Sequence, residues 1–182
     1  MNTDLIAALS LAMLAGCAFK PIAQTEYNMG VEAFRIHDYR SARHHWDAAV
    51  AEHDLHAYNN LGFLLYRGLG GAVDVPRAIA LWTSAAQAGE AESQWHLGQA
   101  YEDGKGVDRS ITEAYAWYRC AIASAQGKAT PQDLDEQIAA DANRSLTQLR
   151  PKLTPAEFQA AEVLAQAHIA AYATRGAEAD KG

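Results

Sequence analysis

The residues that could carry chemistry are histidines and acids, and their spacing matches none of the usual catalytic or metal sites. His53 and His56 lie beside Glu52, and His44 is followed directly by His45. A zinc site needs at least three convergent ligands, and these pairs do not supply such a set. The sequence contains no GxSxG elbow, no Cys-His nucleophile pair and no phosphate-binding loop. We therefore expect no metal, no cofactor and no catalytic residue.

One cysteine offers a different chemistry, which is covalent lipidation. Residues 5–14 form an apolar run interrupted only by Ser10, shorter than the roughly 20 residues of a spanning helix but suited to a secretion signal. The following LAGC, ending at Cys17, resembles the lipobox of bacterial lipoproteins, in which the cysteine is acylated. This resemblance implies a signal peptide over residues 1–16, a lipidated linker over 17–22 and, because Ala18 follows the cysteine, an outer-membrane lipoprotein facing the periplasm.

The first four residues lack the Lys or Arg with which signal peptides begin, and a mis-assigned start codon would explain this. The alternative is an apolar first helix over residues 5–17 with Cys17 buried in it. If Cys17 is acylated, Cys120 has no disulfide partner in the chain and is expected to be a core residue.

Composition limits the class of protein and of partner. The chain has 182 residues, 49% of them apolar, and a formal net charge of -7. An acidic chain without a long basic cluster repels phosphate backbones, so we expect no nucleic-acid partner. No segment alternates β-branched and polar residues as a strand would, which predicts an all-α protein.

An internal repeat dictates how those helices are arranged. An alanine, an aromatic residue four positions later and an alanine three further recur at intervals of 36 residues. The three sets are Ala42, Trp46 and Ala49; Ala78, Trp82 and Ala85; and Ala114, Tyr118 and Ala121. Spacings of four and three place each set on one face of a helix. A glycine precedes each set on an earlier helix (Gly30, Gly62 and Gly98), and we expect a bulky ring or backbone to pack on it.

These motifs resemble a known repeat family. The stretch TEYNMGVEAFRIHDYRSARHHWDAAV looks like a tetratricopeptide repeat, whose second helix opens at Asp38 and Tyr39. The stretches LGFLLYRGLGGAVDVPRAIALWTSAAQAG and LGQAYEDGKGVDRSITEAYAWYRCA look like Sel-one-like repeats, which carry a longer loop with a GxG pair. The resemblance implies a right-handed α-α superhelical solenoid with repeats over residues 23–55, 56–89 and 90–125.

Residues 130–174 lack the repeat signature but keep helical signals. Thr130-Pro131 and Thr154-Pro155 are typical helix starts. Two apolar stripes are expected to face inward: Leu134, Ile138, Ala142 and Leu146; and Phe158, Ala161, Ala165, Ile169 and Tyr172. We expect this helix pair to cap the solenoid, the alternative being a lever or dimer arm, and residues 175–182 to form a disordered tail.

The first helix of each pair is expected to line a concave binding surface. Positions three before, one after and four after each glycine give most of the candidates, and Asn28 and Asn60 match positions where tetratricopeptide domains hold a peptide backbone. The candidate partner-binding residues are Tyr27, Asn28, Val31, Phe34, Asn59, Asn60, Phe63, Tyr66, Trp95, Gln99 and Glu102. We expect about half of these side chains to be accessible, in a groove that runs from aromatic to acidic at Glu102.

Function follows from this surface. The leading hypothesis is a non-enzymatic interaction module, an envelope lipoprotein that binds a segment of a partner protein in a scaffold or assembly role. A second hypothesis is an immunity-type inhibitor of a secreted toxic effector. A third is hydrolase or penicillin-binding activity, which some cysteine-rich members of the repeat family have been linked to, although their disulfide pattern is absent here.

Overall fold

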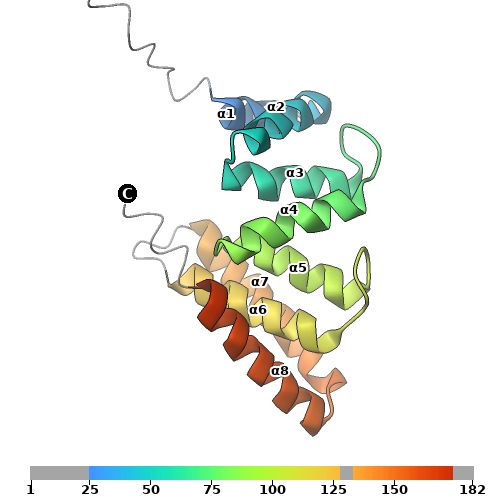
Figure 1. Cartoon of the computed structure of the whole chain (residues 1–182), viewed down its shortest axis with the longest axis vertical. Helices are drawn as coiled ribbons and strands as arrows, with labels where there is room; N and C mark the ends of the chain where they lie inside the picture. The colour runs from blue at the N-terminus through green and yellow to red at the C-terminus, as the bar shows by residue number, and fades with distance from the viewer. Residues whose placement is uncertain (1–24, 128–132, 174–182) are drawn as a thin grey trace, which may run out of the picture.

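The computed structural model describes residues 25–127 and 133–173 and shows an all-α protein of eight α-helices (Figure 1), which confirms the predicted fold class. The helices are α1 (Glu26–Arg35), α2 (Tyr39–Ala51), α3 (Leu55–Arg67), α4 (Val75–Gln87), α5 (Ala91–Asp103), α6 (Ile111–Gln126), α7 (Asp133–Leu149) and α8 (Pro155–His168). A 3₁₀ turn at Arg150–Lys152 precedes α8, and a π-helical turn at Ile169–Ala173 follows it. The expected signal peptide, Cys17, the linker, Thr130-Pro131 and the expected tail lie outside the described residues.

Polar side chains set where the helices begin. Asp38 caps α2 by accepting a hydrogen bond from the backbone N–H of Ser41 at 3.1 Å, as the Asp38-Tyr39 motif predicted. Thr154 and Glu157 form a reciprocal capping box at the start of α8. Such caps satisfy backbone donors that have no partner inside the helix, each contributing about 1 kcal/mol.

Each repeat glycine packs against the aromatic ring of its own helix pair. A Cβ atom added at Gly30 would lie 2.4 Å from the Trp46 ring, one at Gly62 would lie 2.6 Å from the Trp82 ring, and the third glycine meets Tyr118 in the same way. These distances are too short for any side chain, so glycine is required for the two helices to approach. Of the two expected neighbours of each glycine, a bulky ring or another backbone, the structure shows the ring.

The indoles also anchor the first helix of each pair. The Trp46 Nε1 donates a hydrogen bond to the carbonyl of Tyr27, and the Trp82 Nε1 donates one to the carbonyl of Asn59, both at 3.2 Å. Tyr27 and Asn59 hold the same position in their repeats, three residues before the glycine. One contact, repeated, therefore fixes the position of α1 on α2 and of α3 on α4.

Each GxG loop lies between the two helices of one pair and packs against the pair that precedes it. Gly70 has a φ of 74°, and a Cβ atom there would lie 2.2 Å from the backbone oxygen of Tyr39, at the start of α2. Positive φ and close backbone approach both favour glycine, and the predicted positive φ in these loops is confirmed.

The last two helices both pack on α6 (Figure 1). Arg119 of α6 forms an ion pair with Glu162 of α8 at 2.6 Å, and the Tyr115 hydroxyl donates a hydrogen bond to the same carboxylate. One expectation for this region is wrong: Leu134, in the first turn of α7, is 53% exposed, because the buried apolar residues of this helix begin at Ile138.

Cys120 is fully buried in α6, which confirms the expected core position, and burial raises the pKa of its thiol to about 12. Within residues 25–127 and 133–173, none of the helices has the length and apolarity needed to cross a membrane.

Candidate binding groove

A groove of about 430 Å³ opens between the first helices of the three repeats, α1, α3 and α5. Its lining residues are Tyr27, Val31, Phe34, Trp46, Asn59, Asn60, Phe63, Glu92, Trp95 and His96. Trp46 comes from α2, and every other side chain belongs to one of the three first helices. The repeat explains this convergence, because stacked copies of one helix pair place equivalent positions side by side.

Aromatic rings form most of the groove wall. Phe34 lies edge-on to Phe63 with ring centroids 6.4 Å apart, and it also contacts Trp46 at 5.6 Å. Phe34, Phe63, Tyr27 and Trp95 are all partly buried, so part of each residue stays accessible in the groove. Val31, at 40% exposure, lies at the rim. Rigid aromatic side chains of this kind are the commonest anchors at protein interfaces.

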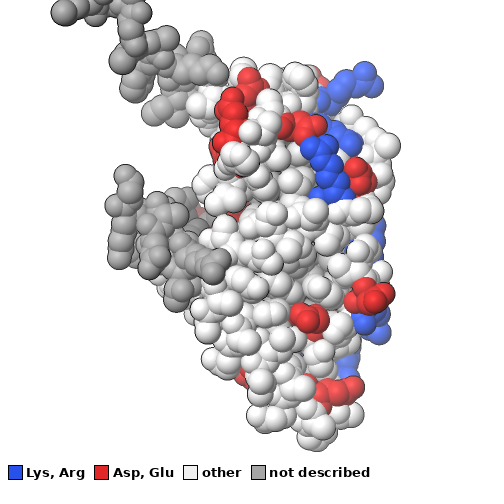
Figure 2. Space-filling model, viewed as in Figure 1, with Lys and Arg blue, Asp and Glu red and all other residues white. Residues whose placement is uncertain are grey.

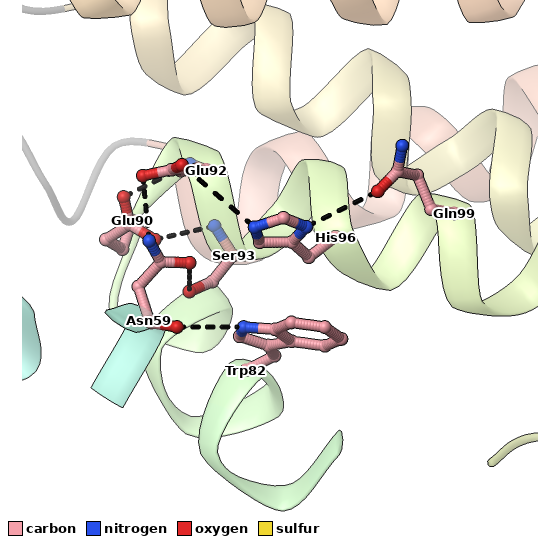
Figure 3. Close-up of polar contacts among 7 residues, drawn as sticks. All are labelled: Asn59, Trp82, Glu90, Glu92, Ser93, His96 and Gln99. Atoms are coloured by element: carbon pink, nitrogen blue, oxygen red, sulfur yellow. Dashed lines mark hydrogen bonds and ion pairs between the residues drawn. The ribbon is translucent and has the colours of Figure 1, made fainter. Parts of the chain in front are cut away.

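A hydrogen-bonded network forms the polar end of the groove (Figure 3). The Asn59 Nδ2 donates a hydrogen bond to Glu92 Oε2 at 2.7 Å, and the Ser93 hydroxyl donates one to Asn59 Oδ1 at 3.2 Å. Glu90, the N-cap of α5, accepts hydrogen bonds from the backbone N–H groups of Glu92 and Ser93. The network holds the Glu92 carboxyl in the groove between α3 and α5.

The environment of Glu92 disfavours its charge. Burial, together with the negative charge of nearby Glu90, raises the pKa of the Glu92 carboxyl to about 7, although the hydrogen bond from Asn59 acts in the opposite direction. A shift of this kind means that the carboxyl exchanges its proton near neutral pH.

His96 is a neutral ring at the base of the groove. It stacks on Trp82 with ring centroids 4.5 Å apart and an interplanar angle of 17° (Figure 3). Burial lowers its pKa to about 4, and its Nδ1 lies 3.4 Å from the side-chain oxygen of Gln99. The Nε2 lies 4.0 Å from Glu92, so a neutral histidine and a titrating acid are neighbours in this groove.

Seven of the eleven candidate residues line the groove. They are Tyr27, Val31, Phe34, Asn59, Asn60, Phe63 and Trp95. Asn59 differs from the expectation because it is 4% exposed and its amide is already bonded to Glu92 and Ser93, so it supports the groove from below.

The other four candidates lie outside the groove lining. Tyr66 packs on Trp82 and is covered by Lys105, whose Nζ lies 3.9 Å from the ring centroid. Gln99 faces His96, and Asn28 sits in the first turn of α1, where its backbone N–H is capped by Thr25.

Glu102, expected to be the acidic end of the groove, accepts a hydrogen bond from the Tyr118 hydroxyl and pairs with Lys152 at 3.1 Å. The carboxylate of the groove is therefore Glu92, because Glu102 has other partners.

Sequence reasoning missed three lining residues, Trp46, Glu92 and His96. A signal for His96 was present, since it lies two residues before Gly98, as Asn28 and Asn60 lie two before their glycines. Glu92 had no such signal, because its position in the groove depends on a contact with Asn59 of α3 that only the stacked helices create.

Lys and Arg side chains are unevenly distributed and are absent from the groove lining. In the face that Figure 2 shows, Lys and Arg side chains gather along one edge, and most of the remaining surface is uncharged. Of the residues that line the groove, none is Lys or Arg.

In the described residues no three His, Cys, Asp or Glu side chains converge as a metal site would require. His45 lies 2.9 Å from Glu26, and that contact accounts for one of the two adjacent histidines.

Comparison with known proteins gives the family of these repeats. Residues 55–90 and 91–125 each match the model of the Sel1 repeat. A stretch of 94 residues, 52% of this chain, is 31% identical to the alginate biosynthesis protein AlgK of Azotobacter vinelandii. This match covers 20% of AlgK.

Two solved structures have a similar fold. One is a protective antigen present in uropathogenic Escherichia coli strains, described as displaying an SLR fold, with a TM-score of 0.72 and 26% identity over 92% of this chain and 33% of that one. The other is a Sel1 repeat protein from Oxalobacter formigenes, with a TM-score of 0.57 and 26% identity over 78% of this chain and 55% of that one. Residues 55–125 of this chain therefore consist of two Sel1 repeats, and its fold is similar to that of solved Sel1-like repeat (SLR) structures.

Proposed function

We propose that this protein is a non-enzymatic interaction module whose groove binds a segment of a partner protein. The observation that carries the proposal is the open groove of about 430 Å³, walled by aromatic rings from α1, α3 and α5. Aromatic rings that stay partly exposed do not stabilise the monomer through the surface that they leave open. A partner that covers this surface would bury it and so stabilise the complex. The similarity to an alginate biosynthesis protein supports a scaffold or assembly role.

The size of the groove suits a short segment better than a whole domain. A volume of about 430 Å³ falls in the usual range of small pockets, roughly 300 to 1,000 Å³. It would hold two or three side chains of an extended or helical segment. The backbone of such a segment would lie over Val31, which is the exposed residue of the lining.

The location that we propose is the bacterial envelope, with residues 1–16 removed as a signal peptide and Cys17 acylated. Incorporation of labelled palmitate into the full-length chain, lost in the Cys17→Ser variant, would support this location. Equal labelling of both chains would contradict it.

The groove is tested by replacing two of its rings with smaller apolar side chains. The variant carrying Phe63→Leu and Trp95→Leu is expected to bind its partner at least tenfold more weakly, because flat anchor surfaces are lost. Circular dichroism is expected to show unchanged helicity. A matched control is Leu134→Ala with Val163→Ala, two exposed apolar residues on α7 and α8. Equal loss of affinity in both variants, or in neither, would contradict a role of the groove.

A further inference from the structure

The chemistry of the groove points to one feature of its occupant. Glu92 is the acid of the lining, and its side chain is 30% exposed. Within the part of the chain that the structure describes, its only ion-pair contact is with His96 at 4.0 Å, and burial keeps that histidine neutral. A partly buried carboxylate without a cation is unfavourable, and this creates a site where a cation from outside would be stabilised.

The charges near Glu92 have the same sign. Tyr27 of α1 has a raised pKa, first because it is partly buried and then because Asp54, Glu92 and Glu90 lie near its hydroxyl. These acids come from the start of α3 and the start of α5. The ring faces of Trp95 and Phe63 add to the effect, because aromatic faces attract cations, and guanidinium groups in particular stack on them.

We propose that the groove recognises an arginine side chain of the partner segment, which pairs with Glu92 and lies against the aromatic wall of Phe63 and Trp95. This inference rests on the proposed function, since it names the chemistry of the segment that the groove would bind. Charge complementarity carries it: the lining contains one carboxyl group, several rings and no Lys or Arg, and its one histidine is kept neutral by burial.

The proposal predicts a pH dependence of binding. The titratable groups around the Glu92 carboxyl are Tyr27 from α1, Asp54 from the start of α3, and Glu90 and His96 from α5. Because the pKa of Glu92 is about 7 in the free protein, binding of a cation below pH 7 must displace a proton. Affinity is therefore expected to rise between pH 5.5 and 8, by at least fivefold, and then to level off.

The test uses the full chain, two small probes and the indole N–H signal of Trp95 in nuclear magnetic resonance spectra. N-acetyl-arginine amide is expected to shift this signal in a saturable way. N-acetyl-citrulline amide has the same shape without the charge, and it is expected to bind at least tenfold more weakly. Glu92→Gln is expected to abolish the preference for arginine and the pH dependence. The matched control, Glu136→Gln on the exposed side of α7, is expected to change neither.

Two results would overturn the inference. Equal binding of the two probes, or an arginine preference that survives Glu92→Gln, would show that the groove binds ligands without reading their charge, and would leave the proposed function intact. The absence of any shift with either probe would overturn the arginine site as well, and cross-linking at Phe63 would then decide separately whether the groove binds a partner.

Discussion

At the scale of single residues, Glu92 and His96 make opposite contributions to the pH dependence of stability. Folded Glu92 keeps its proton up to about pH 7, whereas the unfolded chain releases it near 4.5, so this group makes stability fall as pH rises between those values. In the folded protein His96 stays unprotonated down to about pH 4, whereas in the unfolded chain it is protonated below about pH 6.5. This group makes stability rise with pH, and the two slopes oppose each other between about pH 4.5 and 6.5.

Replacing Glu92 separates the two effects. We expect the stability of Glu92→Gln, relative to the unchanged protein, to increase by about 1 to 2 kcal/mol between pH 5 and 7.5, because the destabilising ionisation of the buried carboxyl is removed. Urea unfolding at a series of pH values measures this difference. The Glu136→Gln variant serves as the reference for an exposed carboxyl, and a pH-independent difference for Glu92→Gln would contradict the assignment.

Residue types and register predicted part of the groove. The glycine register identified Tyr27, Phe34, Phe63 and Trp95, because a helical repeat places equivalent positions on one surface. The same register also selected Glu102 as a candidate. In the structure its carboxylate accepts a hydrogen bond from Tyr118 and forms an ion pair with Lys152. Whether a residue distant in sequence pairs with a side chain depends on the tertiary structure, and sequence periodicity does not predict it.

At the scale of helices, each repeat glycine and the aromatic ring that packs on it act together to hold two helices in contact. The repeat pattern predicted a bulky group on each glycine, and the structure places Trp46, Trp82 and Tyr118 there. The helix starts were also predictable where a capping side chain and an acid mark them, as at Thr154 and Glu157. What the pattern missed was the exposure of Leu134, since the first turn of α7 buries its neighbour Asp135 and leaves Leu134 on the exposed side.

A double-mutant cycle tests the contact between α3 and α4. Gly62→Ala is expected to destabilise the fold by about 1 to 3 kcal/mol, because the new methyl group overlaps the Trp82 ring. In a Trp82→Leu background the same change is expected to cost at least 1 kcal/mol less, since the ring is gone. Additive free energies of unfolding for the two substitutions would show that glycine is needed for another reason.

At the scale of the whole molecule, function depends on stacking more than on any single helix. No one helix holds the groove, because its wall comes from α1, α3 and α5 and its polar end from a network between α3 and α5. The all-α repeat architecture was predictable from the 36-residue period. For residues beyond 125, which lack the repeat signature, the sequence predicted a capping helix pair but not that α7 and α8 would both pack on α6.

The most direct test of the central claim is site-specific photo-crosslinking in cells that make the full-length protein. A photoreactive amino acid at Phe63 lies in the groove, and one at Arg77, on the exposed surface of α4, serves as the control. We predict one discrete adduct at Phe63 and none at Arg77, with the partner identified by the mass of the adduct. No adduct at Phe63, or the same adducts at both positions, would contradict a partner-binding groove.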